Sequence, residues 1–240
     1  MVQGMLENIR IFKENNIRYI PWVETPLSGQ KGKLHNLSQE AVMIITDDFP
    51  TYYPSKAVKN ASRSTKRRMV AVDSNGVFPM SWTDRAYPTA HGFRRFVHLR
   101  FVECMETWPQ FHPIPKGQNL WLDDELFGQL SSEWDTKVTP FEWLWRVGEN
   151  GSSGREALST IDIDHSIPAV SQSQGGRSTA VRMLHEFLSN RLYRYADDRN
   201  AVSKPATSGL SPWLHFGHIS TIEIVQEILQ SNGWDPETIQ

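Results

Sequence analysis

The chain has 240 residues, of which 39% are hydrophobic and 22% are charged, enough for one large domain or two small ones. Its formal net charge of −2 excludes a global attraction to nucleic acid or membranes, so such binding requires a local patch. The single cysteine, Cys104, excludes an internal disulfide and a multi-cysteine metal site. No segment has the apolar length of a membrane span, and we expect a cytoplasmic protein without membrane contact.

The first hundred residues alternate between helical and strand patterns, as βα units with a parallel sheet do. Apolar spacing predicts a helix that ends at Asn15–Asn16, followed by a strand over residues 17–23 (IRYIPWV). Further strands are predicted over 41–49 (AVMIITDDF) and over 68–80 (RMVAVDSNGVFPM), where an Asp-Ser-Asn-Gly turn breaks the run. These apolar runs lack alternation, which predicts a sheet buried between helices.

Residues 105–177 lose this periodicity and gather Pro, Gly and Ser, which indicates a connecting segment. Three predicted strands are few against the roughly 5–6 of an average sheet. The pattern also opens on a helix and stops abruptly in a helical region at its other end. We therefore expect a piece of a longer protein.

From residue 178 the pattern becomes helical. One apolar stripe predicts a long helix that closes with Tyr195. Ser211 before Pro212 predicts a second helix with Ser211 as its cap. Ser220 and Glu223 have the spacing of a capping box and predict a third helix.

The loop before the second of these helices has the chemistry of a phosphate cradle. Thr207 and Ser208 supply hydroxyl donors, and Gly209 lets an oxyanion approach the backbone. A helix that begins at Ser211 would add free amides and a positive dipole end. The alternative is that Thr-Ser-Gly is a helix-capping turn and nothing more. Tyr195 would bring an aromatic ring close to the loop, as a dinucleotide cofactor requires.

Two segments in this order, YADDRN (195–200) and TSGLSPWLHFGHIS (207–220), resemble the FAD-binding signature of the photolyase/cryptochrome family. Upstream, YIPWVETP (19–26), IITDDFP (44–50) and VDSNGVFPM (72–80) resemble the antenna half of its class II branch, the cyclobutane pyrimidine dimer photolyases, or of a bacterial relative of that branch. The resemblance implies an α/β fold followed by an all-α fold. An incomplete Rossmann-like antenna domain would span 1–104, an interdomain connection 105–177, and the first helices of a helical FAD-binding domain 178–240.

The resemblance also implies cofactor, partner and site residues. The cofactor is FAD, and a second, antenna chromophore of unknown identity is allowed. The FAD-binding residues are Tyr195, Thr207, Ser208, Gly209, Leu210 and Ser211. Arg199 matches an arginine near the DNA-facing rim, and a buried salt bridge with Asp197 or Asp198 is its alternative role. The partner is UV-damaged DNA, and the protein is expected to be a monomer.

The implied function is light-driven DNA repair, in which reduced flavin splits cyclobutane pyrimidine dimers by electron transfer. Most flavin contacts of the family follow the TSxLS segment, so this chain alone is expected to be inactive. One alternative is a cryptochrome-like flavin photoreceptor without repair activity. Another is a flavin-free nucleotide-binding α/β module with a helical interaction domain.

Two other features are candidates for binding sites, a histidine pair and a basic cluster. His215 and His218 are three residues apart, but no acidic or cysteine partner is near them in sequence, so no metal site is predicted. The basic cluster RSTKRR at 63–68 could contact phosphate, and surface solubility explains it at least as well.

Overall fold

The computed structural model describes residues 1–17, 19–23, 33–83, 85–109, 144, 147–148, 152–168, 170 and 172–234. The chain divides into two compact units. Unit 1 comprises Met1–Lys31 and Ile114–Ser220, and unit 2 comprises Gly32–Pro113 and Thr221–Gln240. The domain boundaries predicted at 104 and 177 stay predictions, and most of the predicted connection lies outside the described residues.

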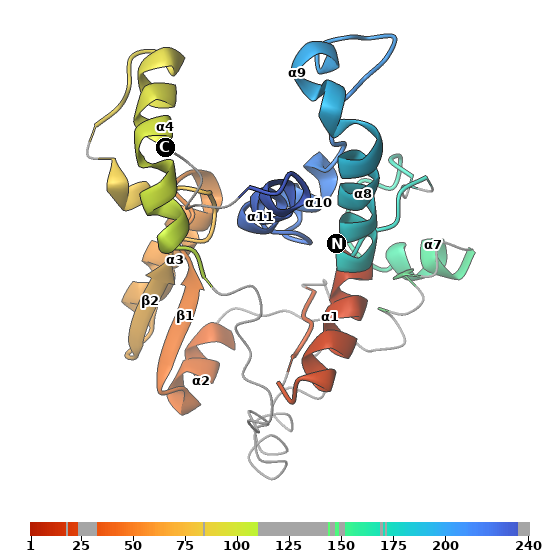
Figure 1. Cartoon of the computed structure of the whole chain (residues 1–240). Coiled ribbons are helices and arrows are strands. Elements are labelled where there is room, and N and C mark those ends of the chain that lie inside the picture. The colour runs from red at the N-terminus through yellow and green to blue at the C-terminus, as the bar shows by residue number, and fades with distance from the viewer. Residues whose placement is uncertain are drawn as a thin grey trace. The chain divides into compact units, whose positions relative to one another are not determined.

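Unit 1 is helical in its described part (Figure 1). Its elements are α1 (Val2–Glu14), α7 (Ser152–Leu158), α8 (Arg177–Asn190), η3 (Leu192–Arg194), α9 (Tyr195–Asp198) and α10 (Ser211–His215). The predicted end of the first helix is confirmed, because Asn15 closes α1 and Asn16 takes a left-handed φ of 55°. The largest buried side chains are Leu144, Leu184, Phe187, Leu210, Trp213 and Ile219.

The strand predicted after α1 is wrong for the described residues of 17–23, which form no strand. The amide of Ile17 donates instead to the carbonyl of Phe12 at 2.9 Å. Tyr19 then stacks on the ring of Phe12, with ring centroids 5.2 Å apart and planes 8° apart. The segment therefore folds back on α1, and its apolar side chains serve the helix rather than a sheet.

Unit 2 contains the sheet. Its elements are α2 (Lys33–Glu40), β1 (Met43–Asp47), α3 (Tyr52–Ser64), β2 (Arg68–Val72), η2 (Met80–Trp82), α4 (Ala90–Glu106) and α11 (Thr221–Ser231). β1 and β2 pair in parallel, with Met43 opposite Arg68 and Asp47 opposite Val72. α3 makes the crossover between them, so β1, α3 and β2 form one βαβ unit (Figure 1). Mixed α and β structure with a parallel sheet is thus confirmed.

Two details of the predicted sheet are wrong. β2 ends at Val72, and the apolar residues beyond the turn form the 3₁₀ helix η2 rather than a second half of the strand. The sheet is also not buried on both faces within the described chain. Burial alternates along β1, where Ile44 and Thr46 are half-buried and Ile45 is 65% exposed. One face of the strand is therefore covered and the other is open.

An aromatic cluster organises the rest of unit 2. The ring of Phe78 contacts those of Trp82, Phe96 and Phe101 at centroid distances of 6.0–6.2 Å. The carbonyl of Val77 accepts hydrogen bonds from Sγ of Cys104 and Nε1 of Trp108, both at 3.1 Å. Burial raises the pKa of the Cys104 thiol, which is fully enclosed. Cys104 is thus a packing residue.

None of the helices in the described part of the chain has the length and apolar character needed to cross a membrane.

Candidate functional site

The loop over residues 206–211 is fixed at two points and open between them. Ala206 and Leu210 are buried, at 0% and 1% exposure, and pin the loop to the core of unit 1. Thr207 and Gly209 are exposed between them. Gly209 has a φ of +71°, a left-handed value that favours glycine. A Cβ added there would meet nothing within 4 Å, so the backbone of the loop faces open space.

One hydroxyl of the loop makes a hydrogen bond within the protein, and the other two are exposed. The hydroxyl of Ser208 accepts a long hydrogen bond from the amide of Leu210, at 3.4 Å, which is a local turn contact. Thr207 and Ser211 are exposed, and neither hydroxyl has a hydrogen bond to another described residue. One hydroxyl therefore stabilises the turn, and two can bind a ligand.

The predicted cap of the following helix is wrong. Leu210 is the N-cap of α10, Ser211 is already helical, and no side chain caps the helix. Pro212 follows within the first turn, where its missing N–H costs nothing. The change of cap follows from the burial of Leu210, which draws the start of the helix one residue earlier. The Ser211 hydroxyl is thereby left outside the cap.

Local charge at the loop suits an anion. Residues 199–222 contain no aspartate or glutamate, while Arg199 and Lys204 lie just before the loop. An anion in front of Gly209 would therefore meet no carboxylate from this stretch of chain, and the partial positive charge of uncapped amides would face it.

α10 and the turn after it are held by a segment more than thirty residues upstream. Nε1 of Trp213 donates to the carbonyl of Gln174 at 3.1 Å. The amide of Gly176 donates to Nδ1 of His218 at 3.1 Å. These two bonds fix the helix and the turn that follows it, and so they fix the end of the candidate loop.

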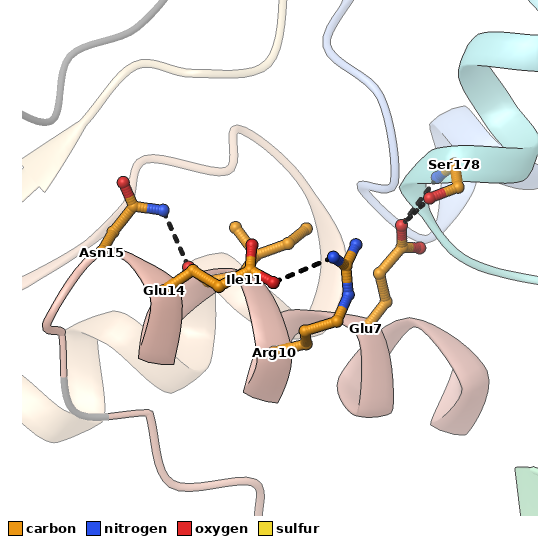
Figure 2. Close-up of polar contacts among 6 residues, drawn as sticks. All are labelled: Glu7, Arg10, Ile11, Glu14, Asn15 and Ser178. Atoms are coloured by element: carbon orange, nitrogen blue, oxygen red, sulfur yellow. Dashed lines mark hydrogen bonds and ion pairs between the residues drawn. The ribbon is translucent and has the colours of Figure 1, made fainter.

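The upstream segment is held in turn by α1. The amide of Gly175 donates to Oε1 of Gln3 at 2.6 Å, and Nε2 of Gln3 donates to the carbonyl of Gly148 at 3.3 Å. Glu7 also accepts hydrogen bonds from the amide, at 2.9 Å, and the hydroxyl of Ser178 in the first turn of α8. Figure 2 shows Glu7 reaching from α1 to Ser178. A carboxylate at this helix start is favoured by the helix dipole.

Sequence reasoning did not find Gln3, Glu7 or the anchoring role of His218. Each contact joins residues that are 42 or more positions apart, and neither helical periodicity nor a local motif marks such pairs. Gly175 and Gly176 are the sequence signal for these contacts, because side chains of Gln3, Glu7 and His218 lie close to where a Cβ of either residue would be.

A pocket of about 340 Å³ lies beside α10 within unit 1. Its lining includes Pro212, Trp213, Phe216 and His218 from α10 and the turn after it, and Met1, Gln3 and Leu158. Its lining is mainly apolar with a few polar groups, as in sites for planar organic ligands.

Tyr195 is not the last residue of the long helix. α8 ends at Asn190, η3 intervenes, and Tyr195 is the first residue of α9. Its ring packs edge-on against Phe187 at 5.8 Å and remains 38% exposed. The earlier stop of α8 turns the chain, and the aromatic contact to Phe187 holds Tyr195 against the helix.

The salt-bridge alternative for Arg199 is wrong. Arg199 is exposed and makes no ion pair with a described residue, while the Asp198 carboxylate pairs with Arg194 at 2.9 Å. The guanidinium of Arg199 is thus free for an external anion, and its role at DNA stays a prediction.

His218 is a structural histidine rather than a polar residue on a helix face. It lies beyond the end of α10, and burial lowers its pKa. Its Nδ1 accepts the Gly176 amide, so the proton of the neutral ring is on Nε2. No group of three potential metal ligands occurs in the described part of the chain.

Comparison with known proteins identifies relatives. No protein-family model matches the chain. It is 25% identical over 200 residues to the deoxyribodipyrimidine photo-lyase of Potorous tridactylus, covering 82% of the chain and 32% of that protein. It is 25% identical over 171 residues to the enzyme of that name from Arabidopsis thaliana, covering 70% and 30%. A 78-residue match to that of Oryza sativa subsp. japonica is 36% identical, covering 30% and 15%.

The names of these relatives agree with the resemblance to the photolyase family found in the sequence. The chain spans about a third of the length of the first two relatives. The assignment to the class II branch stays a prediction.

Proposed function

We propose that this chain is part of a light-driven, FAD-dependent enzyme that splits cyclobutane pyrimidine dimers in UV-damaged DNA. The observation that supports the proposal is the open, acid-free loop 206–211 in a chain whose relatives are named deoxyribodipyrimidine photo-lyases. The incomplete Rossmann-like antenna domain, with its β1–α3–β2 unit, and the second chromophore belong to the same proposal.

The residues of the loop fit a pyrophosphate. The hydroxyls of Thr207 and Ser211 are exposed and would donate to phosphate oxygens. A phosphate oxygen could approach the backbone of Gly209, because glycine has no side chain and the space beside it is open. Ser208 would keep the turn in shape through Leu210, and the buried Leu210 would hold the loop in place. The exposed edge of the Tyr195 ring would pack against the cofactor.

The chain's own contribution is to bind and orient. Bound reduced flavin supplies the absorption of light and the electron that opens the dimer. The rigid connection from α1 through residues 174–178 to α10 would hold the loop at a fixed position. The exposed Arg199 would contact a DNA phosphate.

The test uses the complete protein that contains this chain. We expect it to bind FAD, and the double substitution Thr207→Val with Ser211→Ala to weaken that binding at least about tenfold, because a hydrogen bond to a charged group contributes about 1.5–3 kcal/mol. Ser203→Ala, at an exposed serine before the loop, is the matched control and should leave affinity unchanged. Unchanged affinity in the double variant would remove the site assignment.

Illumination of the loaded protein with dimer-containing DNA tests the activity. Light-dependent loss of dimers supports a repair enzyme. Tight FAD binding without repair would instead favour the photoreceptor, and an absence of FAD binding would favour the flavin-free module.

A further inference from the structure

A stretch of strongly one-sided charge lies in unit 2, apart from the candidate loop. No aspartate or glutamate occurs between residues 49 and 72. Six lysines and arginines occur between residues 52 and 68, in a chain of net charge −2. Most of this stretch is α3 and the turn to β2, and three of the six cations lie on the helix (Figure 1).

Not all of these cations are available to a partner. Arg67 donates through Nε to the carbonyl of Ser38 at 3.0 Å and also binds the carbonyl of Gln39, so it ties the end of α2 to β2. Lys56, Lys59 and Arg63 are exposed, and their side chains form no hydrogen bond or ion pair with any residue that the structure describes. The surface of α3 therefore presents three cations without anionic neighbours.

These three cations form one stripe with an aromatic residue. Lys56, Lys59 and Arg63 stand at positions i, i+3 and i+7 of α3, which places them within a narrow arc of the helix, and Tyr52, the first residue of α3, stands four positions before Lys56. We name these four residues the α3 stripe. It is about 16 Å long at 1.5 Å per residue. The opposite side of α3 carries the half-buried Ala57, Val58 and Ala61, so the apolar side of the helix is partly covered.

The aromatic end of the stripe is unusually open. The side chain of Tyr52 is 84% exposed. Its backbone has a φ of 59°, a left-handed value that is unfavourable for a bulky residue. Neither a ring contact nor a hydrogen bond to a described residue accounts for this conformation. The ring face is available for stacking.

We propose that the α3 stripe binds a single strand of nucleic acid, with Lys56, Lys59 and Arg63 on successive phosphates and Tyr52 stacked on an unpaired base. Cations that follow the backbone, combined with an aromatic platform, are the features of single-strand binding. An acidic protein partner would need apolar anchors at its centre, and the stripe has none between its cations. An amphipathic membrane helix would need a large, free apolar face, and that of α3 consists of small side chains that are half-buried. The proposal goes beyond flavin binding, because the loop 206–211 takes no part in it.

The test measures binding of the full chain to a labelled, undamaged oligonucleotide of about 12 nucleotides by fluorescence anisotropy at several salt concentrations. The triple substitution Lys56→Gln, Lys59→Gln and Arg63→Gln should weaken binding at least about tenfold at low salt. It should also reduce the slope of log affinity against log salt by about 2, since each neutralised phosphate of a single strand contributes about 0.7. Tyr52→Leu should weaken binding about fivefold or more and leave the slope unchanged.

A matched control removes the same charge from unit 1. Lys13→Gln, Arg155→Gln and Arg182→Gln neutralise three exposed cations and should change the affinity less than about twofold. Circular dichroism shows whether each variant is folded. An unchanged salt slope in the triple variant of the stripe would overturn the proposal.

Polyglutamate and vesicles of phosphatidylserine serve as competing anions. We expect both to bind more weakly than the oligonucleotide and to be insensitive to Tyr52→Leu. Equal binding of either probe, or an oligonucleotide affinity that does not depend on Tyr52, would show a general polyanion surface and overturn the proposal. FAD titration of the same variants should be unchanged, which separates this test from that of the proposed function.

Discussion

Apolar side chains differ in exposure between two regions, the helical core around α8 and α10 and the β1–β2 sheet. In the helical core, Leu184, Leu210 and Trp213 are 5% exposed or less. In the sheet, Met43, Ile45 and Val72 are between 43% and 65% exposed. The same kinds of residue are enclosed in one region and open in the other.

The difference shows which side chains are enclosed by contacts within the described part of the chain. The helical core encloses its side chains, and α1 adds long-range hydrogen bonds to the segment beside it. Among the described residues the sheet has two strands, and these residues cover only one face of β1. The described residues of unit 1 therefore fix the geometry of the loop 206–211. The described residues of unit 2 do not cover the open face of the sheet.

The largest expected effect tests this contrast directly. Leu184→Ala removes a fully enclosed side chain and should lower the free energy of unfolding by about 2–5 kcal/mol. Ile45→Ala, at the exposed face of β1, should lower it by less than about 1 kcal/mol. Urea denaturation followed by tryptophan fluorescence measures both. A similar loss for the two variants would mean that the face of β1 is covered in solution.

The second prediction compares two glycines of unit 1. A Cβ at Gly4 would overlap Nε2 of His218, and the ring cannot move without losing its bond to the Gly176 amide. Gly4→Ala should therefore cost about 1–2 kcal/mol, despite the better helix propensity of alanine. Gly209 has space for a Cβ but a φ of +71°, so Gly209→Ala should cost about 1 kcal/mol.

Asparagine separates the two causes. Gly209→Asn should be nearly neutral, because asparagine tolerates the left-handed region, whereas Gly4→Asn should be worse than Gly4→Ala. Thermal unfolding of the four variants measures these differences. Equal effects of asparagine at both positions would contradict the assignment.

Local sequence signals predicted the elements well and their partners poorly. Met43–Asp47 and Arg68–Val72 were predictable because short apolar runs bounded by polar turns are typical of strands. Residues 17–23 have a strand-like sequence of the same kind. Tyr19 nevertheless stacks on Phe12 of α1, and the described residues of this segment form no strand. Periodicity reports the apolar content of a segment, and tertiary contacts decide which surface it covers.

The candidate loop shows the same limit. Thr207, Ser208 and Gly209 could be identified from residue chemistry, and the open space before Gly209 agrees with that chemistry. The cap of α10 could not, because the burial of Leu210 depends on residues far away in sequence. Gln3 and Glu7 carry no motif, and only the folded chain brings them to residues 175–178.

A smaller effect is expected at the start of α8. Glu7→Gln keeps the shape of the side chain and removes the charge that faces the first turn of α8, and it should cost about 0.3–1 kcal/mol. Arg10→Gln removes one partner of the exposed Arg10–Glu14 pair on the same helix (Figure 2), and it should change stability by less than about 0.5 kcal/mol. Urea denaturation in low and high salt compares the two variants. A larger effect of Arg10→Gln would contradict the assigned role of Glu7.

The smallest effect concerns pH and the turn after α10. Burial lowers the pKa of His218 below its ordinary value of 6.5, so the unfolded chain binds a proton more readily than the folded chain does. This residue's contribution to stability is therefore fully present above 6.5, declines as pH falls through 6.5, and levels off below the folded pKa. His218→Gln should flatten this part of the curve of unfolding free energy against pH. If the variant keeps the slope of the parent chain, protonation of His218 does not oppose the bond from Gly176, and the turn depends on Trp213 instead.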